Sequence, residues 1–247
     1  MENHELIRRL EDLAARCEKT GAVTNSHFLS PAEQLQAERA FRGRSVRLLL
    51  HGGHPDCERK VAFFLPYDLE PEYFDPADRL CAIRLTAHFG APGHRDYLGA
   101  LLGMGVGREW VGDIWVEGES AIVFCLPSVE KHLLGIDRAG RVALTAEPVA
   151  VTEVPAPERK REERSFTVMS PRLDAVVSGM FRLSRSEAAR QIALGMVSIN
   201  YELSNKTDYT VREGDVVSLR GAGKGKVAGF GGNSRKGRLY VYTEIYK

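Results

Sequence analysis

A proline-rich, charged segment about two thirds of the way along the chain limits what its 247 residues can fold into. Pro148, Pro155 and Pro157 fall close together, and every residue from Glu158 to Arg164 is charged. Proline fixes φ and donates no backbone hydrogen bond, while mixed charge resists burial, so few contacts should cross this segment. We therefore predict a charged linker at residues 155–164 between separately folded parts.

The parts on either side of this linker carry opposite net charge. From Ser165 onward the chain has 13 Lys and Arg against 7 Asp and Glu, whereas the first 164 residues have 21 against 26. The net charge of +1 for the whole chain hides this asymmetry. A basic part joined to an acidic body indicates a nucleic-acid partner, although many basic surfaces are only solvated.

Composition and the N-terminal residues favour a cytoplasmic protein. Apolar residues make up 43% of the chain and charged residues 27%, which is ordinary for a globular protein. No apolar run approaches the roughly 18 residues that a membrane helix needs. The stretch from Met1 to Glu5 is acidic, where a signal peptide is basic and then apolar. We therefore expect no membrane partner.

The acidic part combines two patterns. Residues 1–75 predict an N-terminal α/β segment with two helices, the second capped by Ser30, and two strands. Residues 76–154 alternate in the order β-α-β-β-α-β, which is the ferredoxin-like arrangement. RNA-recognition-motif (RRM) domains share this topology, but so do many enzymes, and the sequence lacks the aromatic motif on which those domains stack bases.

The basic part, residues 165–247, predicts a small domain of two helices and short strands. Ser170-Pro171 suits the start of one helix, and Ser184 with Glu187 forms a capping box for the next. Gly195 can end that helix, and strands are expected at 196–200, 208–211, 215–219, 227–230 and 239–244. The predicted fold class is therefore α+β.

Basic side chains gather on the second helix of this part and in glycine-rich loops. Guanidinium groups bind phosphate oxygens bidentately, and glycine lets a backbone approach a phosphate chain closely. The unpaired amides of Arg185 and Ser186 at the helix start can also meet phosphate. The candidate RNA contacts are Arg182, Arg185, Ser186, Arg190, Lys206, Lys224, Lys226, Arg235, Lys236 and Arg238.

His94 and Asp96 invite a catalytic interpretation, because histidine and aspartate can act as an acid–base pair. Residues two apart on a helix do not face each other, however, so a capping role for one of them is the simpler prediction. We assign no catalytic residue. Arg95 and Arg108 are candidates for a secondary RNA contact.

Two other patterns invite a metal or nucleotide interpretation. His51, His54 and Cys57 supply three zinc ligands, and a structural site needs a fourth, which Asp56 or His27 would have to provide. The glycines at 103, 105 and 107 follow a helix and precede a strand, which reverses the order of a dinucleotide-binding loop. We therefore predict neither a metal site nor a cofactor.

Four segments of the basic part form a pattern, namely Pro171–Asp174, Leu183–Ala188, Gly195–Asn200 and Gly214–Val217. This pattern resembles the S-four RNA-binding domain, which is named after a small-subunit ribosomal protein. The resemblance implies a helix pair and a small sheet that grip structured RNA. It also implies an RNA face that includes Arg182, Ser184, Arg185, Ser186, Arg190, Asn205 and Lys206.

Further segments lie along nearly the whole chain, namely Phe28–Pro31, Gly52–Asp56 with Glu58 and Arg59, His94–Ala100, Gly105–Glu109, Gly112–Ile114 and Ser234–Arg238. Together they resemble the YlmH family. Ser30 stands where that family usually has an acidic residue, and both residue types can cap a helix. The resemblance implies a bacterial cytosolic protein that binds the large ribosomal subunit. It also implies a role in rescuing stalled subunits that carry peptidyl-tRNA, within ribosome-associated quality control.

One segment also resembles an enzyme. Residues 172–179 are similar to the catalytic aspartate segment of pseudouridine synthases, with Asp174 as the aspartate. Only 73 residues follow Asp174, too few for such a catalytic domain, and the S-four pattern already uses them.

We predict non-catalytic binding of structured RNA by a monomer. The predicted partners are the large ribosomal subunit and its rRNA, with tRNA or peptidyl-tRNA as further candidates. Two alternatives stay open, an RNA-modifying enzyme of the pseudouridine synthase type and a protein-interaction module with an incidental basic face.

Overall fold

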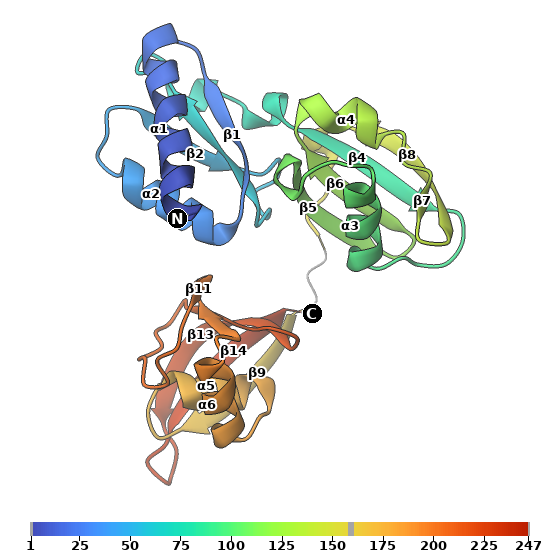
Figure 1. Cartoon of the computed structure of the whole chain (residues 1–247). Coiled ribbons are helices and arrows are strands. Elements are labelled where there is room, and N and C mark those ends of the chain that lie inside the picture. The colour runs from blue at the N-terminus through green and yellow to red at the C-terminus, as the bar shows by residue number, and fades with distance from the viewer. Residues whose placement is uncertain (1, 158–160, 247) are drawn as a thin grey trace. The chain divides into compact units, whose positions relative to one another are not determined.

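The chain folds into two units, Met1–Pro157 and Glu158–Lys247, in the computed structural model shown in Figure 1. The structure describes residues 2–157 and 161–246. Strand β9 begins at Arg161, so residues 161–164, which we expected in the linker, belong to the sheet of the second unit. Of the rest of the expected linker, residues 158–160 lie outside the described residues.

The first unit begins with two helices packed on a three-stranded sheet. Its elements are α1 (Glu2–Thr20), β1 (Thr24–Leu29), α2 (Pro31–Phe41), β2 (Arg47–His51) and β3 (Lys60–Leu65), with strand order β1-β3-β2. The predicted capping box of α2 is present, since Ser30 and Glu33 bond each other's backbone amides. Strand β1 was not predicted, because its residues do not alternate between apolar and polar; pairing with the buried strand β3 makes it a strand.

The second part of this unit has the predicted ferredoxin-like order. Its strands are β4 (Cys81–Ala87), β5 (Val111–Glu117), β6 (Ser120–Cys125), β7 (Arg138–Ala139) and β8 (Val142–Val149), and its helices are α3 (His94–Gly103) and α4 (Pro127–Leu133). Short 3₁₀ turns η1 (Pro71–Tyr73), η2 (Pro76–Arg79), η3 (Arg108–Trp110) and η4 (Val151–Glu153) complete it. The sheet order β5-β6-β4-β8-β7 is antiparallel throughout and adds β7 at one edge.

The two parts of the first unit share a hydrophobic core across residue 75. Phe28 and Val61 from the N-terminal sheet pack in one cluster with Phe124 from β6. The turn that begins at Gly52 makes this contact close, because a Cβ on Gly53 would lie 2.5 Å from the Phe124 ring. Residues on both sides of the predicted boundary at 75/76 therefore pack as one body.

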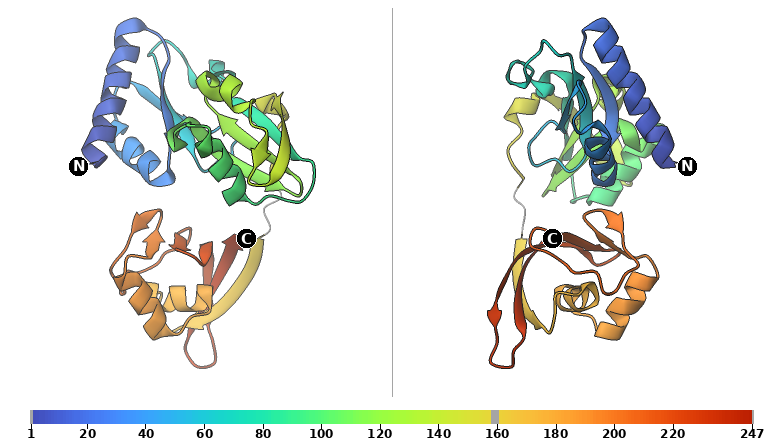
Figure 2. Two further views of the ribbon diagram at one scale, coloured as in Figure 1. Left: turned by 45° about the vertical axis from the view of Figure 1, so that its right-hand side comes forward. Right: turned by 90° about the vertical axis from the view of Figure 1, so that its left-hand side faces the viewer.

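The second unit places two helices on one side of a six-stranded sheet (Figure 2). Its elements are β9 (Arg161–Val168), α5 (Leu173–Phe181), α6 (Arg185–Ala193), β10 (Val197–Ile199), β11 (Glu202–Leu203), β12 (Val216–Leu219), β13 (Gly223–Asn233) and β14 (Leu239–Tyr246). The order is β11-β10-β12-β13-β14-β9. The prediction of a strand at 208–211 is wrong, because that segment forms only one isolated β-bridge, between Thr210 and Arg172.

A substitution at Gly179 tests how closely α5 packs on β9. A Cβ at this position would lie 2.2 Å from the Phe166 ring, so Gly179→Ala should lower the free energy of unfolding by about 1–3 kcal/mol through overpacking. The matched control is Gly99→Ala on α3, where nothing lies within 4 Å, and the higher helix propensity of alanine should stabilise by up to about 1 kcal/mol. Urea denaturation measures both. A Gly179→Ala protein as stable as the parent would contradict the close α5–β9 contact.

Candidate nucleic-acid interface

A tight turn joins α5 to α6 and sets the direction of the second helix. Arg182 ends α5 in the left-handed conformation, with φ 55° and ψ 43°. Ser178 closes the turn through both its carbonyl, which accepts from Leu183 N at 3.0 Å, and its hydroxyl, which donates to Leu183 O at 2.8 Å. Ser184 then caps α6 by accepting from Glu187 N at 3.1 Å. The predicted capping box is half formed, because the Glu187 carboxylate accepts from Arg190 and Gln191 instead.

The buried side of α6 determines which of its residues reach solvent. Ala188 and Ile192 are fully buried against α5 in the core of the second unit. Arg185 and Arg190 consequently point outward, with 55% and 65% of their side chains exposed. Both guanidinium groups are therefore accessible to a ligand.

Asp174 at the start of α5 holds Arg185 in place. Its side chain is only 10% exposed, and its oxygens accept from Arg185 Nε at 3.2 Å and from Arg172 Nε at 3.2 Å. Burial by itself raises the pKa of Asp174. The hydrogen bond from Arg172 and the charges of Arg185 and Arg172 outweigh burial and hold the pKa of that carboxyl below its usual range.

A loop that carries two predicted contacts is tied to the same helix start. The amides of Leu173 and Asp174 donate to the carbonyls of Tyr209 and Thr207 at 2.9 and 3.1 Å. These bonds satisfy amides at the helix N-terminus that otherwise lack partners and bring the loop beside α5. Asn205 and Lys206 lie exposed on this loop. We call the surface formed by Arg182, Ser184, Arg185, Ser186, Arg190, Asn205 and Lys206 the helix face.

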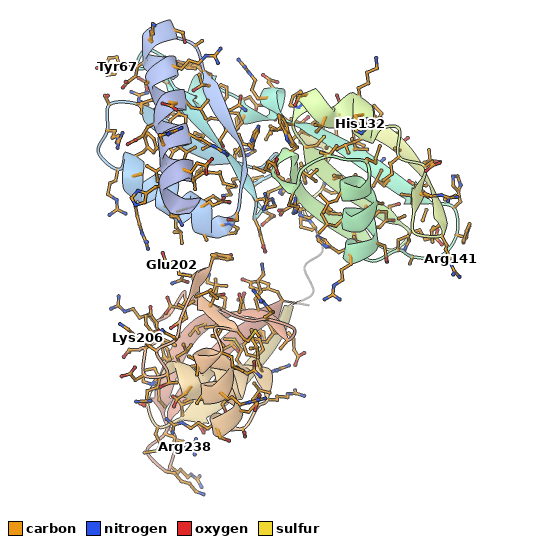
Figure 3. The ribbon with its side chains drawn as sticks, viewed as in Figure 1. Tyr67, His132, Arg141, Glu202, Lys206 and Arg238 are labelled. Carbon is orange, nitrogen blue, oxygen red and sulfur yellow. The ribbon has the colours of Figure 1, made fainter. Side chains whose placement is uncertain are left out.

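The remaining predicted cations lie on the other side of the unit or at its edge. Lys224 and Lys226 are in strand β13 rather than in a loop, and they point away from α5, because Gly225 and Val227, which alternate with them, face the core. The turn between β13 and β14 carries Arg235, Lys236 and Arg238, all exposed. Figure 3 shows Lys206 and Arg238 well apart. The structure therefore separates the predicted RNA contacts into three groups, namely the helix face, the two lysines at the start of β13 and the turn at the other end of that strand.

Arg95 and Arg108, the two candidate secondary contacts, differ in exposure. Arg95 is exposed on α3. Arg108 is half-buried, and its Nη1 donates to the carbonyls of Val111 and Gly112, the second at 2.9 Å. Burial, with a smaller effect from the charge of Arg59, lowers the pKa of Arg108 to about 10. Arg108 therefore braces strand β5 rather than facing solvent.

The sheet of the ferredoxin-like part does not offer its aromatic residues to bases. Trp115 and Phe124 share one face, with ring centroids 4.9 Å apart, and both pack in the cluster shared with the N-terminal sheet. His54 from the turn after β2 covers Trp115 at 5.1 Å. Base stacking of the RRM type needs exposed rings on this face, so any nucleic-acid contact here must use another surface.

The sequence patterns that suggested catalysis and zinc have structural roles. Asp96 caps α3 by accepting from Gly93 N at 2.8 Å, as one of the two capping options predicted. His51 Nδ1 and His54 Nδ1 each accept a backbone amide at 3.1 Å, from Gly53 and Asp56. Among residues 2–157 and 161–246, no three His, Cys, Asp or Glu side chains converge as metal ligands would. Within the same ranges, no helix is long and apolar enough to cross a membrane.

The low pKa of Asp174 predicts a pH-dependent contribution to stability. A carboxyl whose pKa is lower in the folded chain stabilises the fold above its unfolded pKa, about 3.9, and this contribution is lost as pH falls through the folded value. Asp174→Asn should therefore lower the free energy of unfolding by about 1 kcal/mol at pH 7, a modest cost because both arginines are part-exposed. The exposed Glu213→Gln in the same unit is the control. Chemical denaturation at pH 7 and pH 2.5 measures both, and an equal deficit at the two values would contradict the ion-pair explanation.

Two family models match the chain in separate regions. Residues 71–153 match the model described as "Putative RNA-binding domain in YlmH", and residues 171–217 match the S4 domain, the domain named S-four above. The S4 match covers α5, α6 and the loop that carries Lys206. It ends before β13 and β14.

Relatives extend these matches over most of the chain. The ribosome-associated protein quality control protein P2 of Bacillus subtilis is 32% identical over 222 residues, which cover 89% of this chain and 86% of that protein. The small ribosomal subunit protein uS4 of Kosmotoga olearia is 38% identical over 73 residues, which cover 28% of this chain and 35% of that protein. The solved structure of the cell division protein ylmH from Streptococcus pneumoniae has a TM-score of 0.53 at 17% identity over 63% of this chain and 96% of its own, a shared fold. With a relative at this identity along nearly its full length, the chain belongs to the YlmH family and ends in an S4 domain.

Proposed function

We propose that this protein binds structured RNA of the large ribosomal subunit without catalysing a reaction, as a factor of ribosome-associated quality control. The observation that carries the proposal is the helix face, where buried Asp174 holds Arg185 beside the cationic loop of Lys206. The name of the Bacillus subtilis relative supports the link to ribosomes and to quality control. A ribosomal partner in turn favours a cytoplasmic location.

In the proposed mechanism, RNA phosphates replace glutamate carboxylates as the partners of two helix-face arginines. Arg190 pairs with Glu187 at 3.0 Å, and Arg182 lies 3.6 Å from Glu162, both with largely exposed guanidinium groups. Exposed ion pairs of this kind contribute little to stability, so a phosphate that accepts two parallel hydrogen bonds can displace the glutamate. Lys206 forms no ion pair with any described carboxylate and adds charge directly.

Shape and backbone contacts set the specificity in this proposal. An A-form helix hides its base edges in a deep, narrow groove, and proteins grip it through phosphates and 2′-hydroxyls. The exposed hydroxyls of Ser184 and Ser186 and the amide of Asn205 suit the 2′-hydroxyl, which both donates and accepts. A tRNA or peptidyl-tRNA would meet the same surface by the same chemistry. The expectation of a monomer stays a prediction.

The environment of Asp174 argues against the pseudouridine synthase alternative. Both carboxylate oxygens accept hydrogen bonds from arginines, and Oδ1 also accepts from Ala175 N at 2.9 Å. A carboxylate with these partners is oriented toward the helix start and is not free to attack a base. Incubation with ribosomal RNA should therefore leave uridine unchanged in nucleoside analysis by mass spectrometry, and new pseudouridine at any site would favour the enzyme.

Loss of two arginines from the helix face tests the binding proposal. Arg185→Ala with Arg190→Ala should weaken co-sedimentation with isolated large subunits at least about tenfold, with little loss of folding because both side chains are exposed. Plots of log K against log salt concentration should also become shallower by up to about 2, because up to two phosphate contacts are lost.

The matched control removes the same charge from the other unit. Arg8→Ala with Arg16→Ala on the exposed surface of α1 should leave both affinity and salt slope unchanged. If the two double variants lose affinity equally, net charge rather than the helix face governs binding. If the parent protein binds neither subunit at low salt, the ribosomal proposal is wrong.

A further inference from the structure

Two tyrosines lie side by side on the face of the C-terminal sheet that α5 and α6 do not cover. Tyr240 and Tyr242 are 39% and 47% exposed, and they share this face because they are two residues apart on β14. Val241 and Thr243, which alternate with them, are buried toward the helices. Large aromatic side chains usually bury their surface, so an exposed pair on one face calls for an explanation.

Glycines on the neighbouring strand shape the surface around these rings. Gly229 of β13 pairs with Tyr242, and a Cβ on Gly231 would lie 2.9 Å from Cε2 and Oη of the Tyr242 ring and 3.3 Å from Tyr240 Cβ. The Tyr242 ring therefore extends across the bare backbone of β13. The ring occupies the space that a side chain at Gly231 would fill, so any residue larger than glycine there would push it away.

A guanidinium group is anchored beside the first of these rings. Arg238 Nη2 donates to the carbonyl of Thr167 at 2.9 Å, and Thr167 is the cross-strand partner of Tyr240 on β9. Arg235 and Lys236 lie exposed in the same turn, and within the described residues none of these three cations is in an ion pair. The acidic pair Glu163 and Glu244 lies beyond Tyr242, at the end of the face away from the turn. The surface thus joins aromatic rings to positive charge at its turn end.

We propose that Tyr240, Tyr242 and Arg238 form a second RNA contact that stacks unpaired bases, separate from the helix face. Base–aromatic stacking tolerates any sequence, because every base has a π-face, and it needs a cation nearby for the phosphate chain. The anchored Arg238 supplies that cation at the ring edge. The contact rests on the proposed RNA-binding function and extends it to single-stranded segments.

The location of this surface distinguishes it from the S4 domain match. That match covers residues 171–217 and the other family model residues 71–153, so β9, β13 and β14 lie outside both. The helix face binds duplex RNA by its shape, whereas the surface of Tyr240, Tyr242 and Arg238 stacks bases that are not paired. A single RNA with a stem and an adjoining loop can therefore occupy both.

A structural role for the rings has to be separated from a binding role. Aromatic side chains can stabilise glycine-rich strands by covering them, and Tyr242 does cover Gly231. Leucine retains apolar cover but has no ring, and phenylalanine retains both cover and ring. The pair of double variants, Tyr240→Leu with Tyr242→Leu and Tyr240→Phe with Tyr242→Phe, therefore isolates the π-face.

The test uses the full chain and a fluorescein-labelled 12-nucleotide RNA without self-complementarity, measured by fluorescence anisotropy. Stacking on each ring should contribute at least about fivefold to affinity, so the double leucine variant should bind at least about 25-fold more weakly. The double phenylalanine variant should bind as the parent does. Arg185→Ala with Arg190→Ala should retain single-strand binding while its co-sedimentation with the large subunit weakens as predicted above.

Several outcomes would overturn the stacking contact. One is a folded leucine variant that binds the single strand like the parent; another is a loss of that binding with the helix-face variant but not with the leucine variant. If the leucine variant does not fold, Arg238→Gln decides, because it should weaken binding about fivefold and an unchanged affinity contradicts the contact. A parent protein that ignores the single strand but co-sediments with the large subunit would refute the stacking contact and leave the proposed function intact.

Discussion

Asp174 is buried at the start of α5, and its carboxylate accepts hydrogen bonds from Arg172 and Arg185. One residue thus links the start of α5, the start of α6 and, through its backbone amide, the loop that follows β11. A buried carboxylate is costly without partners, and the two arginines supply them. Of the residues on the helix face, Arg185 is therefore positioned by its contact with Asp174, which reduces the entropy that a ligand would lose by ordering it.

The C-terminal sheet is covered by helices on one face, and this produces two different surfaces. On the covered face, α5 and α6 bury the apolar residues and present arginines from the far side of α6. On the uncovered face, Tyr240 and Tyr242 lie over glycines next to an anchored Arg238. The first surface presents charge and hydroxyl groups, for which we propose duplex RNA as the partner, and the second presents aromatic rings, for which we propose unpaired bases.

In the first unit, several of the residues behind the YlmH resemblance hold its two parts together. The Asp113 carboxylate accepts from the amides of Glu58 and Arg59 at 2.7 and 3.0 Å, and the Arg59 guanidinium donates to the carbonyls of Phe28 and Val111. Gly112 lets Phe28 and Phe124 approach, since a Cβ there would lie 2.6 Å from the Phe28 ring. These residues explain why a chain with this pattern buries one face of its ferredoxin-like sheet, and why that face is not an RNA platform.

Sequence alone determined the features that depend on local chemistry. Caps at Ser30 and Ser184, helical periodicity, the β-α-β-β-α-β order and the charge difference between the two parts each follow from neighbouring residues. Tertiary structure decided whatever depends on residues far apart in the chain. Strands β1 and β9 form because each pairs with a neighbouring strand. Lys224 and Lys226 face away from Arg185 because successive side chains of β13 point alternately to the core and to solvent. Asp174 of α5 contacts Arg185 of α6 because the turn between the two helices brings them together. Strand pairing and burial gain their free energy from long-range contacts, which no local pattern contains.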